Sequence, residues 1–447
     1  MSGVTLFRSE RVVTPEGTRA ATVVVRDGRI EGVENAVSVP SGARVLDLGR
    51  SVLLAGIVDC HAHVNEPGRT EWEGFATATS AAAAGGITTV VDMPLNSIPA
   101  TTSLAALQTK AEAAEGQCAI DFGLWGGVVP GNLAALEPMA RAGALGFKAF
   151  LCHSGVEEFP RAGLADLERA LPVLARAGVP LLVHAELADL ETPPEGDARA
   201  YSSYLRSRPA SWEVNAVRAM IALCRTHRAA VHIVHLSAAD ALEDIARAKD
   251  EGLPFTVETC PHYLTFAAED IEAGATHFKC APPIRERENR ERLWEAVGSG
   301  LIDLVVSDHS PCTPSLKKLE SGDFAGAWGG ISGLQLSLSA VWTGFASHGL
   351  ALETLSERMS QRTAKLAGLG GRKGSLRKGY DADLVVFASE EVFTVRAEDL
   401  RHRHKVTPYL GRALRGRVQQ TYVRGERVFD LAGAPCVTGR GQQQRRS

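Results

Sequence analysis

The sequence has no apolar run long enough to cross a membrane as a helix. None of its stretches approaches the about 20 consecutive apolar residues that a spanning helix needs. The segment from Met1 to Thr5 also lacks the charged start and the apolar core of a secretory signal. We therefore expect a cytoplasmic protein.

Paired cysteine motifs and an excess of one charge are also missing. The 8 cysteines are scattered, with no two in CxxC spacing, so neither a disulfide framework nor a zinc ribbon is predicted. Lysine and arginine number 48 against 52 acidic residues, and the net charge of −4 gives no reason to expect nucleic acid or an anionic membrane as a partner. A small neutral or polar molecule is the better candidate for a ligand.

Between residues 53 and 311 the sequence alternates short β-branched runs with longer stretches rich in Ala and Leu. The short runs cover residues 52–60, 87–93, 120–129, 145–152, 179–185, 230–236, 254–259 and 302–307. Helix-like stretches between them include residues 75–84, 164–177, 214–225, 238–250 and 290–297. Eight such units predict an α/β fold, a (β/α)8 TIM-like barrel, whose reactive groups lie where strands end and loops begin.

The two ends of the chain have a different pattern. Residues 1–52 and 372–432 contain short β runs separated by turns, with Asp27-Gly28 marking a hairpin. We expect these segments to form one small β-sandwich domain beside a barrel that spans residues 53–371. Residues 433–447 are rich in Gly, Gln and Arg, and with little to bury they are expected to form a flexible tail.

Candidate metal ligands accompany the predicted barrel strands. His61 and His63 lie two apart at the end of the first run, so both imidazoles can face one ion. Taken singly, strand-end histidines, aspartates and lysines are more often hydrogen-bonded, capping or ion-paired groups. When several such residues all lie at strand ends, metal binding becomes the better interpretation, because a barrel brings its strand ends to one pocket. Four further candidates occupy such positions: Lys148, His184, His235 and Asp308.

Several segments between residues 58 and 387 carry a resemblance to a known superfamily. They are VDCHAHVNEPGRTEWEGF, TTVVDMPLNSIP, GFKAFLCHSG, ETCPHYLTF, FKCAPPIRERENR, DLVVSDHSPC and GSLRKGYDADLVVF. In this order they resemble the cyclic amidohydrolases, the superfamily of dihydroorotases and hydantoinases. Within it they look most like the allantoinases, which open the ring of allantoin to allantoate in purine catabolism.

The resemblance implies a centre of two divalent metals. A lysine at the position of Lys148 is carboxylated by carbon dioxide in this superfamily, and the carbamate bridges the metals; an ammonium would repel them. By this comparison one metal is bound by His61, His63 and Asp308, and the other by His184 and His235. Zinc is the leading candidate, and cobalt, manganese or iron would suit the same ligands. No organic cofactor is implied.

The implied reaction is hydrolysis of a ring amide. A hydroxide held between the metals would be the nucleophile, since metal binding can lower the pKa of water from about 16 to about 7. Asp308 is the predicted general base and acid, which passes the proton to the leaving nitrogen. His153 stands where hydantoinases have an oxyanion-stabilising tyrosine, and we expect it to be catalytic, with Ser154 as the alternative donor.

The choice of substrate depends on residues around the metals. Dihydroorotases have an arginine at the position of Asn65, and an asparagine cannot neutralise a substrate carboxylate, although Arg69 lies close by. Asn65, Asn96 and Ser332 are the predicted substrate contacts; for Asn96 and Ser332 a role as a turn residue is equally plausible. A hydantoinase, dihydropyrimidinase or dihydroorotase activity and a non-catalytic assembly protein remain alternatives. The resemblance also implies a homotetramer.

Overall fold

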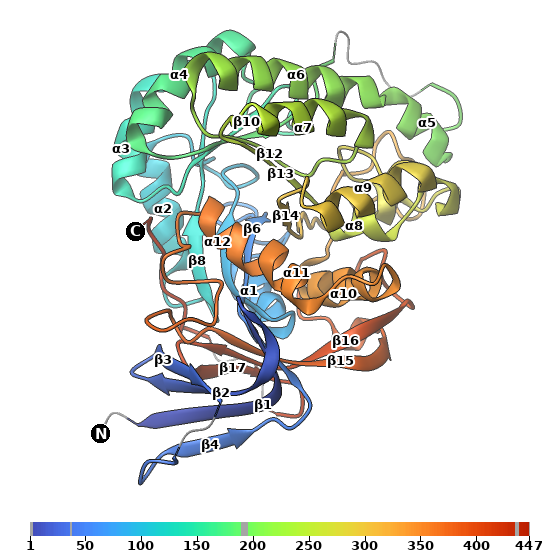
Figure 1. Ribbon diagram of the computed structural model, residues 1–447. Helices are drawn as coiled ribbons and strands as arrows, with labels where there is room; N and C mark the ends of the chain where they lie inside the picture. Colours follow the sequence, from blue (N-terminus) through green and yellow to red (C-terminus); the bar gives the residue numbers. More distant parts are fainter. Residues whose placement is uncertain (1–2, 36–37, 189–194, 434–437, 447) are drawn as a thin grey trace.

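The computed structural model describes residues 3–35, 38–188, 195–433 and 438–446, and it shows a barrel with a β sheet packed beside it (Figure 1). The parallel barrel strands follow chain order, and a bridge between Ala62 and His309 joins the first strand to the segment after the last. The predicted (β/α)8 barrel is therefore confirmed. Its strands are β6 (Ile57–Ala62), β7 (Ile87–Asp92), β8 (Asp121–Leu124), β9 (Gly126–Gly127), β10 (Phe147–Phe150), β11 (Leu181–His184), β12 (Val231–Ile233), β13 (Phe255–Thr259) and β14 (Leu304–Val305).

Amphipathic helices connect these strands. In α4 the buried residues Leu167, Ala170, Leu171 and Leu174 fall on one face, and Gly178 in the left-handed conformation ends the helix. The helices are α1 (Phe75–Ala84), α2 (Leu104–Ala114), α3 (Leu133–Ala142), α4 (Leu164–Ala177), α5 (Tyr201–Ser207), α6 (Ala210–His227), α7 (Leu242–Asp250), α8 (Pro261–Thr265), α9 (Arg287–Ser299), α10 (Ser337–Ser347), α11 (Leu352–Ser356) and α12 (Arg362–Leu366). No helix in the described ranges is both long and apolar enough to cross a membrane.

The two ends of the chain form one eight-stranded sheet in the order β17-β16-β15-β5-β1-β2-β3, with β4 paired to β1. Phe7, Val23, Leu384 and Tyr422 belong to one apolar core, so strands from both ends depend on each other for burial. The predicted small β domain shared by the two ends is confirmed. Its strands are β1 (Val4–Thr14), β2 (Gly17–Arg26), β3 (Arg29–Glu34), β4 (Arg44–Asp47), β5 (Val52–Ala55), β15 (Leu384–Thr394), β16 (Ala413–Val423) and β17 (Glu426–Asp430).

The predicted strand at residues 52–60 is two strands in two different sheets. β5 pairs with β15 in the β domain, whereas β6 pairs with β7 in the barrel. Gly56 lies between them, and a Cβ atom there would overlap the Thr88 side chain. The β sheet therefore continues through Ala55, beyond the boundary predicted at residue 52. The predicted strand at 120–129 is likewise divided, into β8 and β9.

A buried cluster of charges joins the barrel to the β domain. The ammonium of Lys373 lies 2.8 Å from Asp121 at the start of β8 and 2.7 Å from Asp383 beside β15. Burial lowers the pKa of Lys373, but Asp383, Asp121 and Asp381 outweigh it and raise this pKa well above its usual range. The lysine is thus an ammonium ion at neutral pH, which explains how buried carboxylates are tolerated at the junction.

Residues 438–446 lie against the barrel, in contrast to the flexible tail expected there. The Phe122 N–H donates to Gln442 O (3.1 Å), and the Gln444 N–H donates to Phe122 O (2.7 Å). Arg446 Nη1 donates to Leu145 O (2.7 Å). These bonds use the tail backbone and one guanidinium, which a composition poor in apolar residues does not reveal. The rest of the expected tail, at 434–437 and 447, is outside the described residues.

Candidate metal centre and active site

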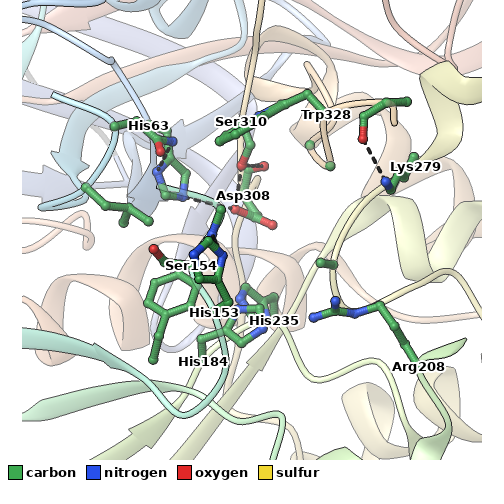
Figure 2. Close-up of a pocket in the computed structure, with 18 of the residues that line it drawn as sticks. His63, His153, Ser154, His184, Arg208, His235, Lys279, Asp308, Ser310 and Trp328 are labelled. Carbon is green, nitrogen blue, oxygen red and sulfur yellow. Dashed lines mark hydrogen bonds and ion pairs between the residues drawn. The ribbon is translucent and has the colours of Figure 1, made fainter. Parts of the chain in front are cut away.

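A pocket with a cavity volume of about 320 Å³ opens at the carboxyl ends of the barrel strands (Figure 2). Its lining includes His63, Lys148, His184, His235 and Asp308, which come from four barrel strands or their ends and from the loop after β14. The volume suits a small molecule. Parallel strands in a closed barrel have their carboxyl ends at one rim, which is why residues so far apart in the sequence meet here.

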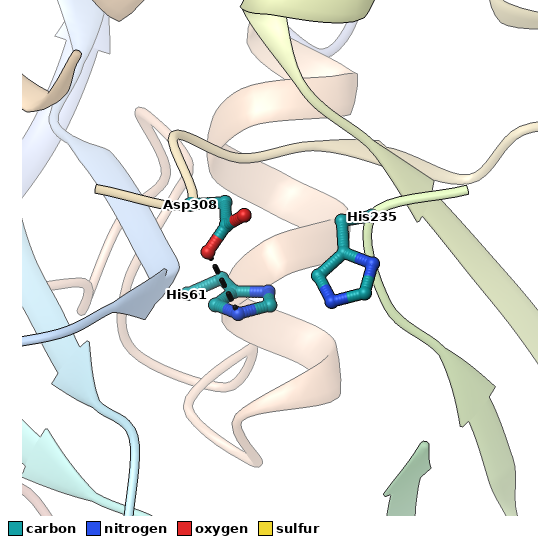
Figure 3. Close-up of side chains that lie close together, drawn as sticks. All are labelled: His61, His235 and Asp308. Carbon is teal, nitrogen blue, oxygen red and sulfur yellow. Dashed lines mark ion pairs between the residues drawn. The ribbon is translucent and has the colours of Figure 1, made fainter. Parts of the chain in front are cut away.

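One half of the site is formed by the first and last strands. Asp308 Oδ1 lies 3.2 Å from His61 Nε2 and 3.6 Å from His63 Nε2. His61, Asp308 and His235 offer ligand atoms that all lie within 4.8 Å of one another, and Figure 3 shows their side chains turned toward a common space. The structure therefore brings His61 and His63 next to Asp308, and their binding of one metal stays a prediction.

The other half adds two histidines and a lysine. The rings of His184 and His235 are 4.6 Å apart, and the ring of His235 is 5.3 Å from that of His61. Lys148 in β10 is fully buried beside Phe150. The six predicted ligands therefore converge on one place.

Two buried glutamates orient the histidines, and the sequence did not reveal either of them. Glu258 in β13 lies 2.5 Å from His61 Nδ1 and 2.9 Å from His232 Nε2. Glu186 lies 2.6 Å from His184 Nε2. A carboxylate on one ring nitrogen holds that proton and leaves the other nitrogen as a lone-pair donor. The one available signal was an acid inside an apolar strand, Val257-Glu258-Thr259.

The ionisation states suit metal binding. Burial lowers the pKa of His63 to about 4 and that of Lys148 to about 8. For Asp308 burial raises the pKa, but His61, His63 and His235 outweigh it and hold the pKa well below its usual range. At neutral pH His63 is therefore a neutral imidazole and Asp308 a carboxylate.

Unsatisfied buried atoms provide a test of whether a metal fits. His61 Nε2, His235 Nδ1 and Lys148 Nζ are all buried, and none forms a hydrogen bond within the described part of the protein. Buried polar atoms without partners are costly and uncommon. Neutral imidazole nitrogens around a carboxylate are a suitable ligand set for divalent ions such as zinc. The residues present thus fit a divalent metal centre.

The other predicted site residues are distributed between the pocket and its surroundings. Asn96 lines the pocket, with Nδ2 3.4 Å from His63 Nδ1. His153 also lines it, and its Nδ1 accepts a hydrogen bond from the Gly155 N–H (3.1 Å). Asn65 is fully buried, donates to Pro311 O (3.2 Å) and is not part of the cavity lining. Ser332 is buried just beyond the lining residues Gly329 and Gly330.

Among the lining residues that were not predicted are Arg208, Lys279 and Trp328. Figure 2 shows Arg208 and Lys279 entering the pocket from the side opposite His63. Arg208 Nε donates to Glu186 Oε1 (2.9 Å), so this guanidinium lies next to the acid that orients His184. Loop arginines and lysines are usually solvated surface residues, and nothing in the sequence distinguished these two.

A parallel barrel that gathers such ligands at the carboxyl ends of its strands has the form of a metal-dependent hydrolase. Residues 52–428 match the Amidohydrolase family, and the chain belongs to this family. It is 52% identical over 432 residues to an allantoinase of Streptomyces avermitilis, covering 96% of each chain. It is 46% identical over 441 residues to an allantoinase of Arabidopsis thaliana, covering 94% of this chain and 87% of that one.

A solved structure supports the same family. The L-hydantoinase (dihydropyrimidinase) from Arthrobacter aurescens has a TM-score of 0.94 and 31% sequence identity, with 100% of both chains covered. The resemblance to the cyclic amidohydrolases is thereby confirmed. The match covers both the barrel and the β domain.

Proposed function

We propose that the protein is an allantoinase, which hydrolyses the ring amide of allantoin to give allantoate. The observation that carries this proposal is the identity of 52% to an allantoinase along 96% of the chain. The pocket is consistent with it, because five of the six predicted ligands line a small polar cavity. The sixth, His61, offers a ligand atom within 4.8 Å of those of His235 and Asp308. A non-catalytic assembly protein would not need these ligands, and their convergence argues against that alternative.

His61, His63 and Asp308 would hold one divalent metal, and His184 and His235 the other. Zinc is the first candidate, with cobalt, manganese or iron as alternatives. When bound, the metals would supply Lewis-acid polarisation of the ring carbonyl and a hydroxide nucleophile near neutral pH. Lys148 would bridge them as the carbamate that it forms with carbon dioxide. Its burial without a hydrogen-bond acceptor supports this, since an ammonium ion would be costly there.

The residues of the pocket would move one proton and bind one oxygen. Asp308 is ionised and accepts a hydrogen bond from the Ser310 hydroxyl at Oδ1 (2.9 Å), which fixes the carboxylate. It would take the proton of the attacking water and deliver it to the leaving ring nitrogen. His153 would donate a hydrogen bond to the oxygen of the carbonyl under attack, and Asn96 would bind a ring or ureido group.

Arg208 is a further candidate for substrate binding. Its Nε and Nη2 atoms both donate to Glu186, while Nη1 has no acceptor among the described residues. We assign Nη1 the ureido carbonyl of allantoin. The pocket contains two cationic side chains, Arg208 and Lys279. The asparagine at position 65, where dihydroorotases have an arginine, is therefore weaker evidence against a carboxylate substrate than the sequence suggested.

A comparison of three substrates tests the proposed function. Protein loaded with zinc in the presence of bicarbonate should open allantoin much faster than hydantoin or dihydroorotate. A clear preference for hydantoin would instead make the protein a hydantoinase, which is the alternative favoured by the structural match to an L-hydantoinase. A preference for dihydroorotate would indicate that Arg208 and Lys279 bind the carboxylate of the substrate. Metal analysis of the same preparation should give two divalent ions per chain.

The proposal includes a homotetramer in the cytoplasm. Light scattering on the purified protein and fractionation of the producing cells test these two points separately. One relative of this chain carries the name mitochondrial allantoinase, so compartment is a property to be measured for each protein.

A further inference from the structure

One wall of the pocket is a loop without helix or strand. Residues 325–330, here called the wall loop, contribute Ala327, Trp328, Gly329 and Gly330 to the cavity lining. A segment without regular structure cannot satisfy its own carbonyl groups through a helix or a ladder. Its position must therefore be determined by donors from elsewhere in the protein.

Lys317 supplies these donors from behind the wall loop. Its side chain is 4% exposed, and Nζ donates to Lys279 O (3.2 Å), to Trp328 O (3.0 Å) and to Gly330 O. No carboxylate within the described ranges forms an ion pair with it. A lysine ammonium has three donors and no acceptor, so three carbonyl oxygens use it completely. The pattern explains why a charged residue is buried here without an acid.

Lys279 binds the same loop from the pocket side. Its Nζ donates to Ala325 O (3.2 Å) and Ala327 O (2.7 Å), and its own carbonyl accepts the Gly330 N–H (2.8 Å). The two lysines together satisfy four carbonyl groups of the wall loop. Lys317 is the one that lies outside the cavity lining and cannot contact a substrate.

The wall loop is also in contact with the catalytic carboxylate through one intermediate residue. Gly330 packs so closely on Ser310 that a Cβ atom would overlap the Ser310 carbonyl oxygen. Ser310 in turn donates its hydroxyl to Asp308. On the other side, the ring of Trp328 packs edge-on against Trp72 at 4.7 Å. A displaced wall loop would therefore change both the width of the pocket and the support of Asp308.

We propose that Lys317 is a positioning residue for ring hydrolysis: its ammonium group holds the Trp328 and Gly330 carbonyls, and so keeps the wall loop in the shape that binds substrate. The proposal relies on the proposed function for the identity of the substrate. The geometry of the loop does not depend on which substrate binds. Amide hydrogen exchange, measured without substrate, tests the position of the loop, and KM tests its effect on substrate binding.

Lys317→Met tests the proposal, with Lys318→Met as the matched control because Lys318 is the exposed neighbour. Removing three donors should speed amide hydrogen exchange in residues 324–332 about tenfold and raise the KM for allantoin about tenfold. Metal content and exchange in the barrel strands should stay unchanged. Lys318→Met should match the unmodified protein in every measurement.

A structural lysine would give a different pattern from a positioning one. Lost folded protein lowers the apparent kcat in proportion and leaves KM unchanged. Faster exchange in residues 324–332 with an unchanged KM would thus overturn the proposal, as would unchanged exchange. Failure of the unmodified protein to open allantoin would reject the proposed function instead, and KM would then be measured with whichever cyclic amide it opens.

Lys317→Arg covers the case in which the methionine variant does not fold. Arginine keeps the charge, but its planar guanidinium cannot direct donors at three carbonyls as a tetrahedral ammonium does. Loop exchange and KM should both rise, by less than in Lys317→Met. An arginine variant equal to the unmodified protein in both measurements would overturn the proposal.

Discussion

A buried lysine without an ion-paired acid is costly as an ammonium ion. Within the described ranges Lys317 and Lys148 are both such lysines, and their surroundings differ. Lys317 is surrounded by carbonyl oxygens, whereas Lys148 has no hydrogen-bond acceptor within the described part of the chain. Burial lowers the pKa of both lysines to about 8, which increases the fraction of neutral amine at each, but only Lys148 lies among the candidate metal ligands. At the scale of single residues, the hydrogen-bond partners of a buried lysine therefore distinguish a structural role, as for Lys317, from a chemical role, as proposed for Lys148.

Replacement of Lys148 by alanine should remove the bridging ligand. Because loss of a ligand weakens metal binding more than loss of an outer partner, we expect metal affinity to fall by more than about 100-fold. Activity should fall with metal content, and short-chain carboxylic acids should partly restore both by occupying the place of the carbamate. Elemental analysis and the allantoate assay measure the two effects. Lys378→Ala, at an exposed lysine, is the control. Full metal and full rate in Lys148→Ala would refute the bridging role.

Arg208→Gln should distinguish substrates that differ in the ureido group. We expect kcat/KM for allantoin to fall about tenfold more than kcat/KM for hydantoin, which lacks the ureido side chain that Nη1 would bind. Glu186→Gln is the comparison, because it disturbs His184 and should lower both values equally. If Arg208→Gln lowered kcat/KM equally for both substrates, Arg208 would act only by holding Glu186 in place and would not bind the ureido side chain.

At the scale of elements, small residues allow two sheets to approach each other. β5 and β6 are consecutive in sequence but belong to different sheets, and Gly56 is the residue at which the chain passes between them. Its N–H donates to Asp383 O (2.8 Å), so the junction is hydrogen-bonded as well as tightly packed. An apolar run that looks continuous can thus contain a domain boundary.

Gly56→Ala should destabilise the fold at this junction. The added methyl group would overlap Thr88, and overpacking of this kind costs about 3 kcal/mol. Urea unfolding should show the loss, and Thr88→Gly in the same chain should recover part of it by making room. Gly3→Ala, where the space around the added atom is open, should leave stability unchanged. Equal stability of the Gly56 and Gly3 variants would contradict this account of the junction.

At the scale of the whole molecule, catalysis and support occupy opposite ends of the barrel. The pocket lies at the carboxyl ends of the strands, while residues 438–446 bind near the amino ends, at Phe122 and Leu145. The charge cluster around Lys373 also lies at the start of β8, next to the β domain. The β domain and the tail thus stabilise the barrel without forming the pocket.

Deletion of residues 438–447 should therefore lower stability and leave catalysis intact. The lost hydrogen bonds to the barrel contribute about 1 kcal/mol each, and we expect the free energy of unfolding to fall by about 3 kcal/mol. The KM and kcat of the folded variant should equal those of the full chain. Gln442→Ala, which keeps the backbone bonds, is the control. A change in KM without a change in stability would show that the tail acts on the pocket.

The sequence alone predicted the alternation of strands and helices, the candidate metal ligands and the family. These features are local or periodic: β-branched runs alternate with amphipathic stretches, and each of His61, Lys148, His184, His235 and Asp308 lies within or next to such a run. A closed barrel then brings those positions together for any sequence that forms it. Identification of the barrel therefore predicted that these residues lie together, and the family resemblance implied that they bind two metals.

Only the tertiary structure decided which residues surround these ligands. Glu258, Glu186 and Arg208 reach the site through contacts between elements distant in sequence, and Asn65 proved to lie behind the pocket lining. Backbone bonds to the tail and to Lys317 have no side-chain pattern that could be read in advance. Periodicity records which face of an element is buried, but the partner on that face depends on how the elements pack.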